Sequence, residues 1–527
     1  MRLLFPGGLN EQQNPNILEC LEGYNFELGL KQSKLIPRKP FDLKGTAPNA
    51  LSANGFLQLV KRDNTETTLT QNGDTVYLWD GSSSFTNKGT VSSSSRLRDC
   101  YWSLGDYLVI TDIAKATVVK KWDGTTLSTL TTGLGTDLYA KYGVVHQNRV
   151  WLANVKTLTD TPHLVVASKL NDPTSYDTTI QGGPTAEGGG TFSIGTEAFF
   201  LLSPDLKPIN GMLSFFGNLV ISTEGGRLFK LTGTSASTYK FMPYYSGSAA
   251  TGDESMSDIG NDIAYMKSGG GIDSLSTTQT SGDVAADDLS RWIPTTTKDL
   301  TGAITIYDQK NQKVLFFVSG KILVMFKDLV GAELSPWSVY KTQQSFAFNT
   351  NAAKYMKMPG TQVYSVYFGD DIGRIFDLNG IGDGDAGSSN IAVLRKTRYI
   401  YDGEGGDKFG KGSLDLKHKI LDGVIQYRRV FDPCDVTISF DWGDEYNISS
   451  STITLKGAPT SFEGVYYGGG SYYSGTAYFS QGGAFADKIS NQTFSPTGKG
   501  PGFFCSVSLD TTTAFQIDSV DLQPPKR

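Results

Sequence analysis

One structural unit recurs along most of the chain and constrains the fold more than any other feature. Each copy has an apolar strand, a glycine-containing turn, a second apolar strand and a short closing motif, as in TVYLWDG, ATVVKKWDG, GRLFKLTG and GRIFDLNG. The closing motifs fall near positions 79, 122, 168, 231, 275, 326 and 378, so most neighbouring motifs are 43 to 52 residues apart. Self-similarity with a period of about 20 to 50 residues is typical of solenoids, propellers and other arrays.

The content of each unit decides between these architectures. Hairpin patterns, in which strand-rich runs flank one or two glycine-type residues, precede several closing motifs, for example at residues 100–112, 212–225 and 314–328. The period matches the roughly 40 to 50 residues of four-stranded propeller repeats. We therefore predict an all-β fold with a β-propeller of about seven blades, six or eight also being allowed, at residues 49–390. The longest step contains a glycine-rich stretch, which we assign to a loop insertion near residues 179–205.

The repeated Trp-Asp dipeptide does not identify a WD-repeat protein. Those repeats combine Trp-Asp with an upstream Gly-His, whereas the three histidines of this chain, His146, His163 and His418, do not occupy that position. We interpret the dipeptides at Trp79 and Trp122 as strand ends of adjacent blades instead.

The pattern changes on both sides of the predicted propeller. Residues 1–48 contain the stretch KLIPRKPFDLKGTAP, in which Pro37 and Pro40 forbid a helix interior or a central strand, so we predict an extended N-terminal arm. Residues 391–527 contain longer strands with alternating apolar residues, typical of an antiparallel β-sandwich domain. A glycine- and tyrosine-rich loop at residues 464–485 interrupts these strands.

Two of these segments are candidates for contact with partner proteins. The arm is basic and could dock on an acidic neighbour, a solvated loop being the alternative interpretation. The loop at residues 464–485 is either mobile or a contact surface. The candidate partner-binding residues are Lys31, Lys34, Arg38, Lys39, Phe41, Tyr466, Tyr467, Tyr472 and Tyr473.

Charge and cysteine content limit the chemistry further. The net charge of −6 lacks the basic footprint of a protein that grips nucleic acid, so we expect only transient, non-specific contact with double-stranded DNA. Four cysteines without a C-x-x-C pair argue against a zinc or redox motif, and only Cys434 and Cys505 share a region in which they could meet.

No stretch of the sequence approaches the about 20 apolar residues of a membrane span, and the N-terminus lacks a signal-peptide core. We therefore expect synthesis in the cytoplasm.

Catalysis is not predicted, because the chain has no G-x-S-x-G motif and only three histidines. The stretch DLNGIGDGD offers oxygen ligands of the kind that calcium prefers, at Asp377, Asn379, Asp383 and Asp385. It lacks the closing glutamate of an EF-hand, so a solvated turn is the alternative interpretation. Apart from this calcium candidate, no cofactor is predicted.

The opening sequence FPGGLNEQQNPNILECLEGYNFELGLKQSKLIPRKPFDLKGTA, the segment ASKLNDPTSYD and the C-terminal AFQIDSVDL resemble the tail nozzle (tail tubular or hub) proteins of short-tailed bacteriophages. The resemblance spans most of the chain through loose motifs. It implies a non-catalytic structural protein of the virion tail, made in the host cytoplasm. In that family, copies assemble, usually as a homohexamer, below the adaptor of the portal, and the propellers form the wall of a DNA channel. The resemblance thus implies a nozzle ring that extends the portal-adaptor channel, conducts DNA during ejection and anchors tail fibres or other tail proteins.

A receptor- or glycan-binding propeller is the alternative function. Its affinity would come from aromatic side chains of the loop at residues 464–485.

In a nozzle ring, by contrast, acidic subunits would repel DNA phosphates and let the duplex pass without being held.

Overall fold

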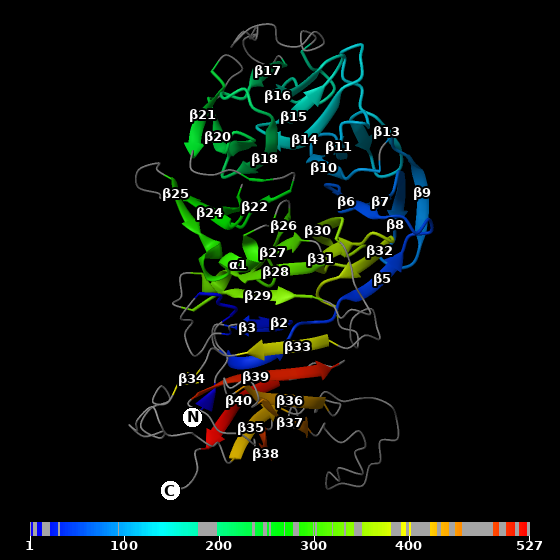
Figure 1. The fold of residues 1–527 in the computed structure, drawn as a ribbon. Helices are drawn as coiled ribbons and strands as arrows, with labels where there is room; N and C mark the ends of the chain where they lie inside the picture. Colours follow the sequence, from blue (N-terminus) through cyan, green and yellow to red (C-terminus); the bar gives the residue numbers. More distant parts are fainter. Residues whose placement is uncertain are drawn as a thin grey trace, which may run out of the picture. The chain divides into compact units, whose positions relative to one another are not determined.

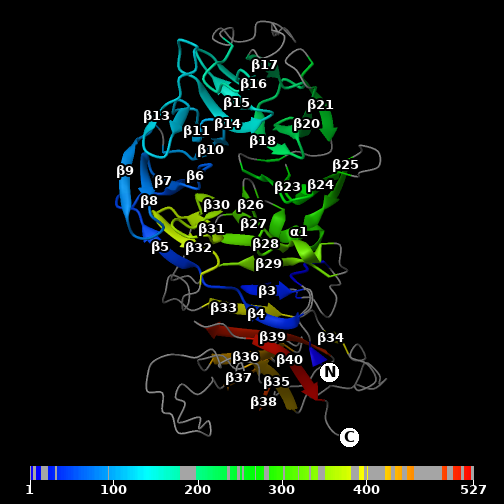
Figure 2. The ribbon, with the colours of Figure 1, turned by 180° about the vertical axis from the view of Figure 1, so that it is seen from behind.

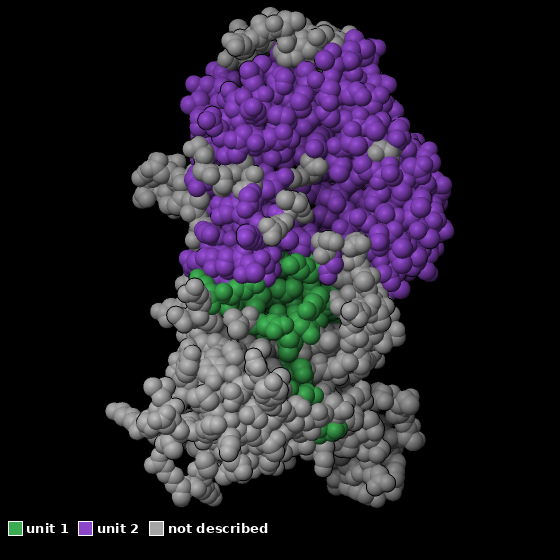
Figure 3. All heavy atoms as spheres, in the orientation of Figure 1, with its two compact units in different colours: residues 1–42, 321–347, 380–527 green, residues 43–320, 348–379 purple. Residues whose placement is uncertain are grey.

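The computed structural model describes residues 2–3, 8–12, 20, 22–29, 32–92, 94–177, 198–233, 238–245, 250–251, 254–267, 269–277, 284–298, 300, 303–318, 320–330, 334–341, 350–380, 391–396, 400–401, 422–428, 434–441, 448–455, 489–494, 502–511 and 516–523. The chain divides into two compact units, coloured in Figure 3. Unit 1 comprises residues 1–42, 321–347 and 380–527, and unit 2 comprises residues 43–320 and 348–379.

Nearly all regular structure in the described residues is β-strand. The helical elements found there are one short α-helix, α1 (Pro294–Thr297), and 3-10 turns at Leu289–Trp292 and Lys327–Leu329. The all-β prediction is therefore confirmed.

Seven four-stranded sheets succeed one another along the chain, coloured from blue to yellow in Figures 1 and 2. The first sheet consists of β6 (Ala53–Val60), β7 (Glu66–Asn72), β8 (Thr75–Trp79) and β9 (Phe85–Thr90), and the second of β10 (Leu97–Trp102), β11 (Tyr107–Asp112), β12 (Lys120–Trp122) and β13 (Leu127–Thr129). The third sheet consists of β14 (Tyr139–His146), β15 (Arg149–Lys156), β16 (Asp160–Ala167) and β17 (Phe199–Leu202), and the fourth of β18 (Ile209–Phe215), β19 (Asn218–Thr223), β20 (Arg227–Thr232) and β21 (Lys240–Tyr245). The fifth sheet consists of β22 (Met256–Asp258), β23 (Asp262–Met266), β24 (Ile272–Thr277) and β25 (Val284–Asp288), and the sixth of β26 (Ile304–Asp308), β27 (Lys313–Val318), β28 (Lys321–Phe326) and β29 (Trp337–Tyr340). The seventh consists of β30 (Ala352–Lys357), β31 (Tyr364–Gly369), β32 (Arg374–Asp377) and β5 (Asp42–Thr46).

The innermost strands close a ring within unit 2. Each of β6, β10, β14, β18, β22, β26 and β30 contacts the next, and β30 contacts β6. The fold is thus a seven-bladed β-propeller, as the repeat spacing predicted. The fourth strand of the seventh blade, β5, comes from the part of the chain that precedes the first blade, so the two ends of the propeller sequence meet in one sheet.

The local chemistry of Trp79-Asp80-Gly81 explains why this triplet ends a blade strand. Trp79 is the last residue of β8 and is buried. The Asp80 carboxylate accepts the backbone N–H of Ser82 at 2.8 Å and of Ser84 at 3.3 Å, which folds the chain into a turn. Gly81 has a φ of 91°, a conformation that a residue with a Cβ rarely adopts.

The second triplet repeats this geometry one blade further on. Trp122 ends β12 and is buried, and Asp123 accepts the backbone N–H groups of Thr125 and Thr126 at 2.9 and 2.8 Å. The Trp122 indole N–H donates to the hydroxyl of Thr67, on β7 of the preceding blade, at 2.9 Å. Each motif therefore ends a strand, starts a turn and fills the space between blades.

The predicted loop near residues 179–205 is wrong at its C-terminal end. β17 lies inside that range and pairs with β16 as the outer strand of the third blade. The short apolar run of Phe199, Phe200, Leu201 and Leu202 was overlooked beside the glycines; three of these side chains are buried. Residues 178–197 lie outside the described residues.

Unit 1 contains two further sheets, which join N-terminal and C-terminal strands. One has the order β3-β4-β40-β35-β38, with β1 beside β40, and the other has the order β2-β33-β39-β36-β37, with β34 beside β39. Their strands are β1 (Arg2–Leu3), β2 (Glu22–Tyr24), β3 (Phe26–Gly29), β4 (Gln32–Pro37), β33 (Ile391–Lys396), β34 (Ile400–Tyr401), β35 (Asp422–Arg428), β36 (Cys434–Asp441), β37 (Ile448–Leu455), β38 (Ile489–Phe494), β39 (Gly502–Thr511) and β40 (Gln516–Gln523).

The expected extended arm is therefore, in its described part, largely a set of strands of the chain's own sheets. Pro37 is the last residue of β4, so its missing N–H removes no hydrogen bond from the interior of the strand. The C-terminal strands predicted by alternation are present as β35, β36, β39 and β40, whereas their packing as a sandwich stays a prediction. In the register of β36 with β39, Cys505 lies opposite Phe440, six residues from Cys434. That separation is about 20 Å along a strand, too far for a disulfide between the two cysteines, although they share this region.

Within unit 1, N-terminal residues cover the edge of β29. Gly8 and Leu9 donate backbone hydrogen bonds to the carbonyls of Ser335 and Trp337, each at 2.8 Å, and Asn25 donates to that of Val339 at 2.7 Å. A Cβ on Gly8 would lie 2.1 Å from the Trp337 carbonyl oxygen, so the close approach requires glycine. The segment protects an edge that would otherwise expose unpaired backbone groups.

Candidate functional site

The candidate site is the axial pocket of unit 2, at the centre of the ring of inner strands. It has a volume of about 260 Å³. Its charged lining residues are three cations and two carboxylates: Arg96, Arg98, Lys354, Asp99 and Glu254. Burying charged side chains is costly, because each must find a partner when water is displaced.

The second blade supplies most of these charges. Arg96 precedes β10, and Arg98 and Asp99 are its second and third residues. Successive side chains of a strand point to opposite faces. Accordingly, the Arg98 guanidinium lies 4.7 Å from the centre of the Tyr142 ring on the third blade. Asp99, facing the other way, accepts the backbone N–H of Gln58 on the first blade at 3.1 Å.

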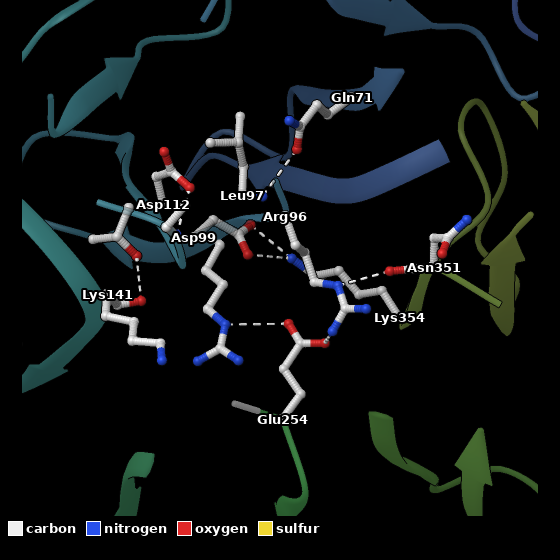
Figure 4. A network of polar contacts seen from close by, with 12 residues as sticks. Gln71, Arg96, Leu97, Asp99, Asp112, Lys141, Glu254, Asn351 and Lys354 are labelled. Atoms are coloured by element: carbon white, nitrogen blue, oxygen red, sulfur yellow. Dashed lines mark hydrogen bonds and ion pairs between the residues drawn. The ribbon is translucent and has the colours of Figure 1, made fainter. Parts of the chain in front are cut away.

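Glu254 connects two blades that are not neighbours. It precedes β22 of the fifth blade, and its carboxylate oxygens lie 2.5 Å from Nη1 of Arg96 and 3.2 Å from Nε of Arg98. Figure 4 shows Arg96 and Glu254 approaching each other from separate segments. Because the second and fifth blades lie on different sides of a seven-membered ring, these ion pairs cross its axis.

A second pair ties the seventh blade to the second. Nζ of Lys354, on β30, lies 2.5 and 2.6 Å from the two carboxylate oxygens of Asp99. Nε of Arg96 also donates to the carbonyl of Asn351, just before β30, at 2.7 Å, as Figure 4 shows. The network therefore links the second blade to the fifth and the seventh through charge-assisted hydrogen bonds, which are the stronger class.

Outside the pocket, His146, Ser214 and Cys100 are side chains of types that can act as a base or a nucleophile. Nδ1 of His146 lies 3.3 Å from the hydroxyl of Ser214, and burial lowers the pKa of His146. A serine nucleophile also needs its base oriented by a third group, commonly a carboxylate; within the described part of the chain His146 has no such hydrogen bond. Burial raises the pKa of the Cys100 thiol, which makes it inert at neutral pH.

The calcium candidates that are described take part in a local hydrogen-bond network. The Asp377 carboxylate accepts the Ser365 hydroxyl and, at 2.9 Å, the backbone N–H of Asn379. The Asn379 amide donates to the Asp308 carboxylate at 3.2 Å. Asp383 and Asp385 lie outside the described residues. Among the residues that are described, no group of three or more His, Cys, Asp or Glu is placed to hold a metal ion.

Two of the predicted partner-binding residues lie inside unit 1. Arg38 is only 2% exposed and donates to the side chain of Asn25 at 3.0 Å, and its guanidinium lies 3.6 Å from the centre of the buried Phe41 ring. Their contacts are thus with their own chain, whereas Lys39 is exposed. The other predicted residues, Lys31, Tyr466, Tyr467, Tyr472, Tyr473 and the side chain of Lys34, lie outside the described residues.

Our sequence reasoning missed the axial network. A signal was present in the stretch SRLRDCYW, residues 95–102, where three charged residues stand directly before the predicted hairpin at residues 100–112. Glu254 carries no comparable signal, since its partner Arg96 is 158 positions away in the sequence.

Comparisons with known proteins find distant structural similarity. No family model matches the sequence, and no curated protein matches it. Similar solved structures include virginiamycin B lyase from Staphylococcus aureus (10% identity, 63% of this chain and 96% of that chain, TM-score 0.40) and the Cps50 (Swd1) β-propeller domain from Myceliophteria thermophila (10%, 64% and 99%, 0.38). A third is PorZ, a surface component of the type-IX secretion system of Porphyromonas gingivalis (10% identity, TM-score 0.36), and the match covers 71% of this chain but 44% of PorZ. At this level of similarity, the functions of these proteins do not transfer to the chain.

No helix in the described ranges has the length and apolar character needed to cross a membrane.

Proposed function

We propose that this chain is a structural subunit of a phage tail nozzle, in which several copies form a ring around the path of the DNA. The observation that carries the proposal is the set of ion pairs across the propeller axis, between Arg96 or Arg98 and Glu254. They join blades that the ring of inner strands leaves unconnected. A propeller braced in this way is a rigid block suited to a wall.

The same ion pairs bear on where DNA would pass in the proposed ring. Side chains from the second, fifth and seventh blades meet in the axial pocket, and its volume of about 260 Å³ is far below that of a duplex. In the proposal, DNA therefore passes through the lumen of a ring of subunits, outside each propeller. Closed rings of identical copies are the usual way to build such a lumen.

The resemblance to nozzle proteins supports the proposal through residues that make specific contacts. Gly8 and Leu9, from the Gly-Gly-Leu-Asn start, hydrogen-bond to Ser335 and Trp337. Arg38 and Phe41, from the R-x-P-F element, stack on each other. The resembling residues thus belong to a folded element. The net charge of −6 fits a lumen that does not hold DNA tightly.

Electron microscopy of the virus particle that carries this chain tests the proposal. Labelled with a specific antibody, the chain is expected in a symmetric ring, with six copies as the proposed number, around the axial channel of the tail. Cross-linking followed by mass spectrometry is expected to join it to the head-to-tail adaptor. A label confined to peripheral fibres, or absent from particles, would overturn the nozzle proposal and favour a receptor-binding role in the first case.

A further inference from the structure

The charges of the axial pocket do not balance. Lys354 pairs with Asp99, while Arg96 and Arg98 share the single carboxylate of Glu254. Arg96 takes the shorter contact, 2.5 Å against 3.2 Å. Among its charged lining residues the pocket therefore holds one positive charge in excess, contributed mainly by Arg98.

Arg98 has hydrogen-bonding capacity that its described neighbours do not use. Its side chain is only 15% exposed, and its Nη2 is buried and makes no hydrogen bond to any described residue. Its Nε contacts Glu254 as an ion pair without hydrogen-bond geometry. The Tyr142 ring covers the face of the guanidinium but cannot accept in the plane of its N–H groups. A guanidinium stays charged at all physiological pH and has five N–H donors, so a buried N–H of it that lacks an acceptor is costly.

A second polar group of the same pocket also lacks a hydrogen-bond partner among the described residues. The hydroxyl Oγ1 of Thr305 is buried and makes no hydrogen bond within the described part of the chain. The backbone N–H of Thr305 donates to the Glu254 carbonyl at 2.8 Å, which fixes the residue beside the acidic side of the network. A hydroxyl can donate to an anion that an arginine also binds.

The volume of the pocket sets the size of a ligand. About 260 Å³ exceeds the roughly 30 Å³ share of one water and lies below the roughly 300–1,000 Å³ typical of sites for drug-sized molecules. We propose that the axial pocket binds a small tetrahedral oxyanion, the size of inorganic phosphate, with the Arg98 guanidinium and the Thr305 hydroxyl as donors. The anion offsets the excess positive charge, and its oxygens accept from groups that otherwise remain unpaired. This inference is independent of the nozzle proposal.

Binding is measured with the full-length protein by ³¹P NMR line broadening of inorganic phosphate, at constant ionic strength maintained with sodium chloride. We expect saturable broadening by the wild-type protein, and an affinity at least about tenfold lower in Arg98→Gln, because the variant loses the charged donor. Arg62→Gln removes an exposed arginine paired with Asp106 and is the matched control, with unchanged binding expected.

A second variant keeps the test decisive if Arg98→Gln does not fold. Thr305→Val removes only the hydroxyl, and we expect it to weaken phosphate binding about three- to tenfold while the circular dichroism spectrum stays the same. Absence of saturable broadening by the wild-type protein, or equal binding by a folded Arg98→Gln or Thr305→Val variant, would overturn the proposed site. None of these outcomes bears on the proposed ring, because that proposal is tested by electron microscopy of the assembly and not by phosphate binding.

Discussion

The indole ring of Trp79 meets the ring of Tyr367 edge-on, with 5.7 Å between the ring centroids and 74° between their planes. Trp79 belongs to β8 of the first blade and Tyr367 to β31 of the seventh. The contact therefore lies at the seam where the ring of blades closes. Both side chains are fully buried, in a cluster that also contains Phe56, Met356 and Ile375.

Trp79→Ala is predicted to destabilise the propeller by about 3–5 kcal/mol, because it leaves a large cavity in the closure seam. It also removes an indole N–H that donates to the Ser82 carbonyl at 2.6 Å. Trp122→Ala is the matched comparison, since Trp122 fills the interface between the first and second blades. Equilibrium unfolding in urea checks both, and a loss below about 1 kcal/mol for Trp79→Ala would contradict a seam held by this contact.

The position of β5 predicts a sharp boundary for N-terminal truncation. A variant lacking residues 1–47 loses β5 and leaves the seventh blade with three strands. We expect its propeller to melt at a lower temperature than that of a variant lacking residues 1–41, which keeps β5. Thermal unfolding followed by tryptophan fluorescence compares the two, and equal midpoints would show that β5 does not hold the ring closed.

The blades could be predicted from the sequence because their signals are local. The buried Trp79 and the positive φ of Gly81 both lie at the end of one strand, so a triplet reports a blade boundary without knowledge of the rest. The predicted motif positions lie within two residues of the ends of the seven third strands. Relations between distant segments were not visible. The pairing of β5 with the seventh blade and the approach of Arg96 to Glu254, 158 residues away, are set by the closed ring itself.

Glu254→Gln is predicted to destabilise the protein by about 1–3 kcal/mol, because two arginines lose the carboxylate that balances their charge. The pair with Arg96 is about one-fifth exposed, so solvent screens it only in part. Urea unfolding at low ionic strength measures the loss. In the double variant with Arg96→Gln, the combined loss is expected to be smaller than the sum of the single losses.

The exposed pair between Arg62 and Asp106 provides the control for that experiment. Arg62 is 62% exposed, and exposed pairs contribute roughly 0–1 kcal/mol. Arg62→Gln is therefore expected to change the free energy of unfolding much less than Glu254→Gln. If the two variants lose equal stability, the ion pairs across the axis do not brace the propeller.

The stability of the protein is predicted to fall as the pH drops below about 6.5, in part through His146. Burial lowers the pKa of His146 in the folded protein, whereas an unfolded histidine has a pKa of about 6.5. Below that pH the unfolded chain binds the proton more readily than the folded chain, so the contribution present at neutral pH is lost progressively. The ring lies edge-on to Trp151, and its Nδ1 lies near the neutral hydroxyl of Ser214, which offers no charge to stabilise an imidazolium. The free energy of unfolding, measured between pH 7.5 and 5.5, is expected to decrease less in His146→Gln than in the wild type. If the free energy of unfolding of His146→Gln decreases with falling pH as steeply as that of the wild type, groups other than His146 cause the acid sensitivity.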